Sequence, residues 1–244
     1  MLLQNPGAGG PFNQEPDDLS GHAHRQLIGI LGALLPILVW IIARLRPTQE
    51  LPGTALLDSI SGYYYTGAVA VFVGILAVLA VFLFTYQGYN NPEHRLDRAA
   101  AVTAGAAAVL VAFFPTSPPS QNVRLEWWTE WMGKAHLASA AILFASFIFF
   151  SLVLFPKKKK STVDTARDKK VRNAIYLVCG WAMVGCILWI VLNTLVLHRS
   201  IFWPEALALE FFAVSWLAKG RAELTAMYVA RRMMFRPAVP NPDA

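Results

Sequence analysis

The chain has 244 residues, of which 56% are hydrophobic and only 15% are charged. A soluble domain carries about 25% charged residues, so this composition excludes an ordinary soluble protein and favours an integral membrane protein. The net charge of +6 does not indicate a nucleic-acid partner, because aromatic residues are not interleaved with the basic ones and no nucleic-acid-binding module is present.

Six apolar stretches follow one another along the chain, and each is close to the roughly 20 residues that a helix needs to cross a bilayer. They are residues 26–43, 66–86, 99–115, 136–155, 173–197 and 202–218. We therefore expect an all-α bundle of six transmembrane helices in one domain, residues 25–235. Residues 1–24 are expected to form a disordered or loosely attached N-terminal tail, and residues 236–244 a C-terminal tail.

Lys and Arg are distributed unevenly between alternate connections. If the N-terminus lies inside, the outer segments hold only Arg44, Arg46, Arg124, Lys134 and Arg199. Because cytoplasmic loops carry the excess of basic residues, this asymmetry predicts that both termini are cytoplasmic. The protein is thus predicted to be a multi-pass protein of the cell (inner) membrane.

The segment before the second stretch is rich in hydrogen-bonding side chains. Asp58, Ser59, Ser61, Tyr64 and Tyr65 lie here, on the predicted outer side. Such a density of polar groups at a membrane entrance indicates a polar pocket. The alternative for the tyrosines is an interfacial belt, because Tyr favours the headgroup level of a bilayer.

Two histidines and two carboxylates are also expected near the outer leaflet. His136 begins the fourth stretch and His198 follows the fifth, and Asp58 and Glu205 complete a candidate cluster. These residue types could hold a metal ion, and the two histidines could ligate a haem. The spacing matches no HxxxH, HExxH or CxxC motif, so the cofactor is left open.

Glu210 lies in the middle of the last apolar stretch. A carboxyl group at bilayer depth usually faces protein or water and often marks a working site. We expect Glu210 to face the bundle interior, with a polar partner such as Asn193, Ser139 or Ser146. Interhelical hydrogen bonding is one role for it, and proton coupling in a transporter or channel is the other.

Two local features complete the sequence picture. Leu125, Trp128, Trp131 and Met132 recur at helical spacing, which predicts a short amphipathic helix over residues 127–132 in the plane of the outer interface. Cys179 and Cys186 are seven residues apart inside an apolar stretch, so they share one helix face and are not expected to form a disulfide.

Several short segments carry a resemblance to a known family. They are residues 59–66, 72–74, 84–89, 112–116 and 215–220, together with Asp97. On these segments the chain resembles the DUF998 type of bacterial six- or seven-span membrane proteins. The resemblance implies the membrane architecture and no particular activity.

A more distant likeness is to the ceramidase-like membrane hydrolases, which carry a Ser four residues before a metal-binding His and a late HxxxH pair. Here Tyr65 follows Ser61 at that spacing, and Glu205 and Glu210 occupy the region of the late pair. These departures remove the expected metal ligands, so no zinc hydrolase activity is carried over.

The sequence favours a non-enzymatic membrane protein that binds a lipid or small amphiphile through an outer-side polar cavity, or that serves as a subunit of a larger membrane assembly. Membrane lipid, a protein partner or a second copy are the expected partners. The alternatives are a metal-dependent lipid hydrolase and a proton-coupled transporter or channel that uses Glu210. The candidate ligand-binding residues are Asp58, Ser59, Ser61, Tyr64, Tyr65, His136, Glu205 and Glu210.

Overall fold

The computed structural model describes residues 16–48, 51, 56–86, 94–157 and 166–221, and within these ranges the chain is helical with no β-strand. Its α-helices are α1 (Pro16–Leu45), α2 (Val69–Thr85), α3 (His94–Phe113), α4 (Glu130–Phe149), α5 (Ala166–Leu192) and α6 (Phe202–Lys219). The short helices η1 (Ser61–Tyr65) and η2 (Gln121–Val123) lie in connections, whereas η3 (Phe150–Leu154) and η4 (Asn193–Leu197) continue α4 and α5 as π-helical turns. The predicted all-α class is confirmed for these residues.

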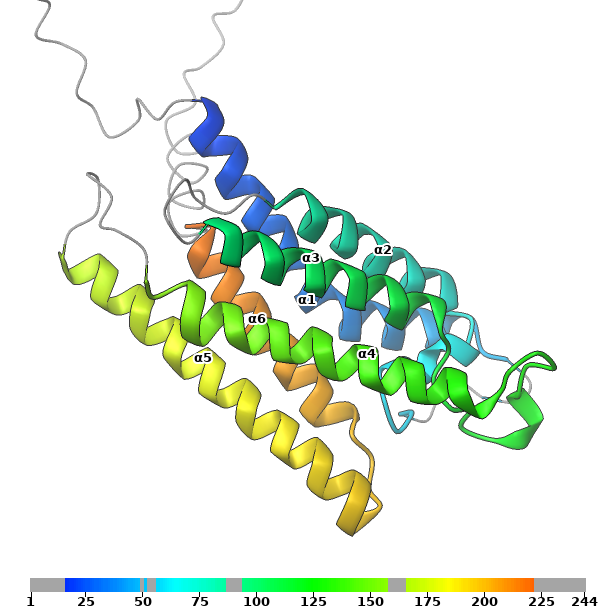
Figure 1. Ribbon diagram of the computed structural model, residues 1–244. Coiled ribbons are helices and arrows are strands. Elements are labelled where there is room, and N and C mark those ends of the chain that lie inside the picture. The colour runs from blue at the N-terminus through cyan, green and yellow to red at the C-terminus, as the bar shows by residue number, and fades with distance from the viewer. Residues whose placement is uncertain (1–15, 49–50, 52–55, 87–93, 158–165, 222–244) are drawn as a thin grey trace, which may run out of the picture.

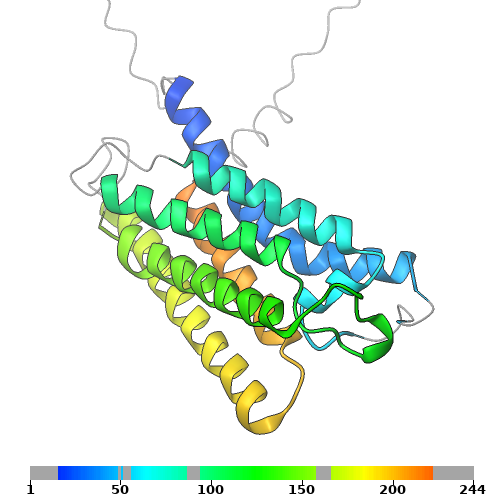
Figure 2. The same cartoon turned by 45° about the vertical axis from the view of Figure 1, so that its right-hand side comes forward.

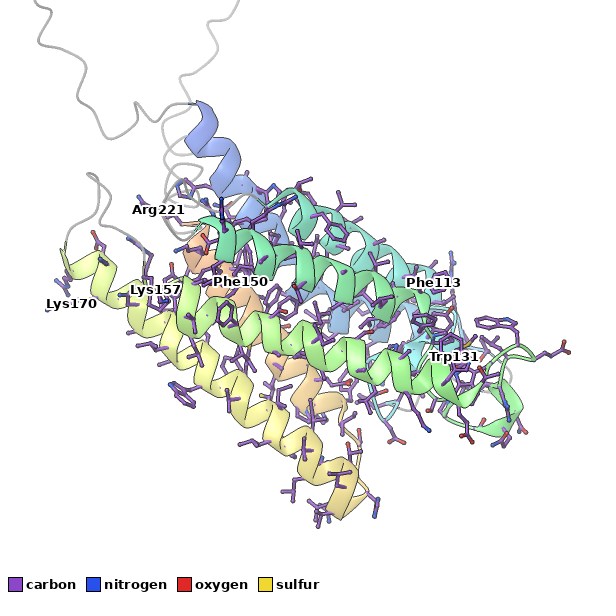
Figure 3. The ribbon with its side chains drawn as sticks, in the orientation of Figure 1. Phe113, Trp131, Phe150, Lys157, Lys170 and Arg221 are labelled. Atoms are coloured by element: carbon purple, nitrogen blue, oxygen red, sulfur yellow. The ribbon has the colours of Figure 1, made fainter. Side chains whose placement is uncertain are left out.

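Successive helices run in opposite directions, so the bundle has two distinct ends (Figures 1 and 2). One end holds the starts of α1, α3 and α5 and the ends of α2, η3 and α6. We call it the basic end, because Lys157, Lys170 and Arg221 lie there (Figure 3). The opposite end, called the loop end, holds η1, η2 and the connection between α5 and α6.

Among the described residues, four helical segments are long and apolar enough to cross a membrane: Gly21–Leu45, Arg95–Phe113, Glu130–Leu154 and Arg167–Leu197. The apolar helix α2 is shorter, with 17 residues, and α6 carries three charged residues among its 18. Large apolar side chains such as Leu137, Val178 and Leu195 lie exposed on the outside of these helices. Large exposed apolar side chains along several helices are typical of helices that face lipid. The chain is therefore a membrane protein.

Helix α6 packs mainly against α1 and α5 and contributes two large aromatic side chains to the core. Phe212 and Trp216 are fully buried, and the ring of Phe212 stacks on Phe147 of α4 with 3.7 Å between centroids. Aromatic side chains bury the largest apolar areas of any residues, so this cluster supplies much of the packing that joins α4 to α6.

Two glycines of α1 allow α1 to approach α6 closely. A Cβ added at Gly32 would lie 2.6 Å from the ring of Phe212, and one added at Gly29 would lie 2.9 Å from the carbonyl oxygen of Ala213. Small residues at a helix contact let two backbones come together, which is a common packing mode in membranes. The positions of these glycines thus fix how closely α1 approaches α6.

Two sequence-based expectations differ from the structure. Helix α1 begins at Pro16, inside the range expected to be a loose tail; residues 1–15 and 236–244 lie outside the described residues. The predicted helix over residues 127–132 is wrong, because Thr129 is extended (φ −132°, ψ 153°) and α4 begins only at Glu130. The cause is Trp128, which is buried and donates its indole N–H to the carbonyl oxygen of Pro115 instead of sharing an apolar face with Trp131.

Candidate functional site

The polar segment before α2 folds into a tight turn that satisfies several of its own hydrogen bonds. The Oγ atoms of Ser59 and Ser61 lie 3.3 Å apart, and the backbone N–H of Gly62 donates to Ser59 Oγ at 3.0 Å. The hydroxyl of Thr66 donates to the carbonyl oxygen of Tyr63 at 2.8 Å. These local bonds explain why the Ser- and Thr-rich sequence forms η1 instead of an extended entry to the helix.

The same segment is tied to the start of α6. Glu205 Oε2 accepts a hydrogen bond from the backbone N–H of Ile60 at 2.6 Å, and the carbonyl oxygen of Asp58 accepts one from the backbone N–H of Ile201 at 2.7 Å. Ser200 Oγ also donates to the Asp58 carbonyl, at 3.2 Å. We call these contacts the loop-end latch. The latch uses the backbone of Asp58, while the Asp58 side chain is exposed.

Tyr65 connects this segment to the link between α3 and α4. Its hydroxyl donates to the carbonyl oxygen of Thr116 at 2.6 Å, and burial of the phenol raises the pKa of Tyr65 to about 12. Tyr64 is half-buried, with its ring edge-on to Tyr65 and Phe72. Burial likewise raises the pKa of Tyr63. Both tyrosines with raised pKa values therefore pack inside the protein and do not form a belt on its surface.

The two histidines of the candidate metal cluster lie in different surroundings. His136 of α4 is buried, with its Nδ1 atom 2.7 Å from the carbonyl oxygen of Phe114. His198 is exposed on the connection between α5 and α6, in the left-handed backbone conformation (φ 47°). Within the described ranges no three His, Cys, Asp or Glu side chains come together in a way that could hold a metal ion. The His136 contact joins the C-terminal end of α3 to the N-terminal part of α4.

Glu210 lies at the border between the buried and the exposed faces of α6, so it does not point fully into the bundle interior as expected. Of the residues one turn away from it, Leu207 and Val214 are 40% and 46% exposed, whereas Ala206 and Ala213 are buried, and Glu210 itself is half-buried. The interior face of α6 instead carries Glu205, Phe212 and Trp216, which are spaced by seven and four residues.

The expected polar partners of Glu210 are occupied elsewhere. Asn193 donates to the carbonyl oxygen of Ser200, while Ser139 and Ser146 donate to carbonyl oxygens of their own helix, at Ala135 and Ile142. No hydrogen bond to the Glu210 carboxyl is found among the residues that the structure places. Glu210 therefore presents an acidic group at the edge of an otherwise apolar outer surface.

Sequence reasoning missed a set of charged side chains buried at the basic end. Arg25, Asp97 and Lys219 are only 7%, 2% and 7% exposed. Lys219 Nζ donates to the carbonyl oxygen of Phe155 at 3.2 Å and lies over the rings of Phe155 and Tyr176, and Arg25 lies over the ring of Tyr86. Cations in contact with aromatic faces are stabilised more strongly when they are desolvated.

A periodic signal for these buried charges was present in the sequence. Asp97 falls on the same helical face as the buried residues Ala101, Ala104 and Ala108, and Lys219 falls on the face of Phe212 and Trp216. Spacings of three and four residues place side chains on one face of a helix, so both charges could have been assigned to the interior.

Taken together, six of the eight candidate ligand-binding residues lie in or beside the loop-end latch: Asp58, Ser59, Ser61, Tyr64, Tyr65 and Glu205. His136 packs nearby against the end of α3, and Glu210 lies apart from them at the edge of the outer face of α6. Comparison of the chain with family models, with curated proteins and with solved structures gave no match in any of the three.

Proposed function

We propose that the protein is a non-enzymatic subunit of a larger membrane assembly, and that the outward face of α6 around Glu210 contacts a transmembrane helix of a protein partner. In this proposal all six helices cross the cell (inner) membrane, and the basic end lies in the cytoplasm. The observation that carries the proposal is the half-buried Glu210 carboxyl, which lies at the edge of the apolar outer surface of α6 without a hydrogen bond among the described residues.

The position of Glu210 along α6 determines how much it costs to place its carboxyl group in the bilayer. It follows Phe202 by eight residues and precedes Lys219 by nine, which is about 12–14 Å from either end at the rise of an α-helix. An acidic residue at the centre of a bilayer costs roughly 2.5–3.5 kcal/mol on insertion scales. A donor on a neighbouring helix would offset part of this cost, since interhelical hydrogen bonds in membranes contribute about 0.6–2 kcal/mol.

The carboxyl group also indicates what the partner presents. Two copies related by a two-fold axis through this face would bring Glu210 against Glu210, which is unfavourable unless the pair shares a proton. A different protein whose helix carries an amide, hydroxyl or basic side chain avoids this repulsion and satisfies the acceptor oxygens. We therefore favour a heteromeric partner with a hydrogen-bond donor at bilayer depth.

Site-specific photo-crosslinking in native membranes tests the proposal. A photoreactive residue at Leu207 sits one turn from Glu210, and one at Ile142 on α4 serves as a control of similar exposure. Position 207 should give one discrete protein adduct, which Glu210→Gln retains and Glu210→Leu loses, whereas position 142 should give lipid adducts alone. Lipid adducts alone at position 207 would contradict the proposal, and an adduct of two copies of this chain would overturn the choice of a different protein.

A further inference from the structure

A groove on the outer surface of α3 lies near the basic end, away from both the loop-end latch and Glu210. Its volume is about 490 Å³, and it is lined by Arg95, Arg98, Ala99, Val102 and Thr103. All of these side chains except that of Arg98 are exposed, and Arg98 is half-buried. α3 packs between α2 and α4 (Figure 2), so the groove faces outward from the bundle.

The polarity of the groove changes along the helix. Arg95 and Arg98 belong to the first turns of α3, at the basic end, and the lining residues Ala99, Val102 and Thr103 follow toward the middle of the bundle. The groove therefore combines a cationic part at the level of one membrane surface with a mainly apolar part that reaches into the bilayer. This is the order of charge and apolar surface in a phospholipid, from its phosphate to its acyl chains.

The guanidinium of Arg98 is held in place by the end of α2. Its Nη1 atom donates to the carbonyl oxygens of Phe84 and Tyr86. A guanidinium has five N–H donors in a fixed planar arrangement, and among the described residues only those on Nη1 are used. Arg98 thus remains able to donate from Nε and Nη2 to an anion, without the entropy cost of ordering a mobile side chain.

We propose that this groove binds one anionic phospholipid, with its phosphate at Arg95 and Arg98 and an acyl chain along Ala99, Val102 and Thr103. Arginine binds phosphate through paired, charge-assisted hydrogen bonds, and a basic residue near an anionic bilayer contributes about 1 kcal/mol of attraction. The apolar part of the groove favours a lipid over free phosphate, because inorganic phosphate offers nothing to cover it. The proposal requires a membrane but is independent of any partner at Glu210.

The chain provides a closely matched control for the two arginines. Arg167 and Lys170 occupy the second and fifth positions of α5, as Arg95 and Arg98 do in α3, and they are exposed at the same end of the bundle. They do not line the groove. Arg95→Ala and Arg167→Ala therefore remove the same charge at equivalent helix positions, and neither residue makes a hydrogen bond within the described ranges.

Native mass spectrometry of the full-length, delipidated protein gives the readout. We expect one phosphatidylglycerol to bind at least about fivefold more tightly than phosphatidylcholine with the same acyl chains, and Arg95→Ala to weaken that binding about fivefold. Arg167→Ala should leave it unchanged. Equal binding of the two lipids, or equal effects of the two variants, would overturn the proposal. Displacement of the lipid by inorganic phosphate at equimolar concentration would overturn it as well.

A second pair of variants tests the apolar part without changing charge. Val102→Trp places an indole in the apolar part of the groove, while Val109→Trp places the same bulk on the same face of α3 two turns away, at a position of similar exposure. The first variant should lose the bound phosphatidylglycerol and the second should retain it, with equal melting temperatures as the check on folding. Retention of the lipid by Val102→Trp would exclude this groove as the site.

Discussion

The carboxyl oxygen Oε2 of Glu205 accepts a hydrogen bond from the backbone N–H of Ile60 at 2.6 Å, across 145 residues of sequence. This bond joins the start of α6 to the segment that enters α2. The bonds from Ile201 and Ser200 to the carbonyl oxygen of Asp58 reinforce the same connection. The loop end of the bundle is therefore closed by contacts between the first and last connections of the domain.

Replacing Glu205 with Ala should destabilise the protein, because it leaves the buried N–H of Ile60 without an acceptor. An unsatisfied buried donor costs about 1–3 kcal/mol. Glu205→Gln keeps an acceptor oxygen of the same reach and should retain most of the stability. Reversible unfolding in mixed micelles measures both variants, and equal stability of Glu205→Ala and wild type would show that the bond between Glu205 and Ile60 contributes nothing to stability.

We expect the folded protein to lose stability at alkaline pH because of the buried phenol of Tyr65. Its pKa is raised by burial from 10.0 to about 12, so the folded protein favours the protonated phenol that donates to Thr116. The stability that the protonated phenol contributes is fully present below pH 10. It is lost as the pH rises from 10 toward 12, because the phenol of the unfolded state gives up its proton first.

The test compares wild type with Tyr65→Phe. The variant lacks the bond to Thr116 and should be less stable by about 0.5–1.5 kcal/mol near neutral pH. The difference in stability between the two proteins should shrink as the pH rises from 10 toward 12, because only wild type has a titrating group at position 65. A difference in stability that stays constant from pH 8 to pH 12 would contradict the role assigned to the phenol.

The close contact between α1 and α6 gives a sharply controlled prediction. Gly32→Ala would place a methyl group 2.6 Å from the ring of Phe212, whereas a methyl group at Gly74 of α2 would meet nothing within 4 Å. Overpacking of this kind costs about 1–3 kcal/mol, while Gly→Ala at an open helix position gains up to about 1 kcal/mol. Thermal unfolding in detergent should therefore show a lower melting temperature for Gly32→Ala and a higher one for Gly74→Ala than for wild type. Equal melting temperatures of the two variants would argue against the observed packing of α1 on α6.

Much of the fold followed from local patterns. The last apolar stretch, residues 202–218, matches α6 (Phe202–Lys219), and the second, residues 66–86, contains α2 (Val69–Thr85). Apolar stretches of this length determine helices through local composition, so the sequence was sufficient there. It failed at residues 127–132, where the burial of Trp128 against Pro115 interrupts a pattern that looks helical.

The candidate site was harder to predict, because its contacts depend on which helices pack together. Sequence reasoning singled out Glu205 and the polar segment near residue 60 separately, but no local spacing links two positions so far apart. The polar residues expected to pair with Glu210 bond elsewhere in the structure for the same reason. A carboxyl group on an apolar helix suggests the interior, and only the packing of α6 shows that Glu205 bonds to Ile60 while Glu210 lies at the border of the exposed face.

The orientation in the membrane can be tested with single cysteines at opposite ends of the bundle. Lys170→Cys lies at the basic end, and Ser120→Cys lies in the connection between α3 and α4; both positions are exposed. The native Cys179 and Cys186 are buried and unpaired, so their background labelling should be low. A membrane-impermeant maleimide added to intact cells should label position 120 and spare position 170, and the reverse pattern would invert the proposed topology.

The central claim is that Glu210 joins this protein to a partner, and the mass of the assembly extracted from native membranes tests it most directly. Polymer-bounded membrane discs keep the surrounding lipid and avoid detergent competition for the apolar face of α6. Wild type and Glu210→Gln should migrate as one heavier complex of fixed stoichiometry, and Glu210→Leu should migrate as the single chain with unchanged melting temperature. A wild-type protein found only as a single chain, or a Glu210→Leu complex identical to wild type, would contradict the account.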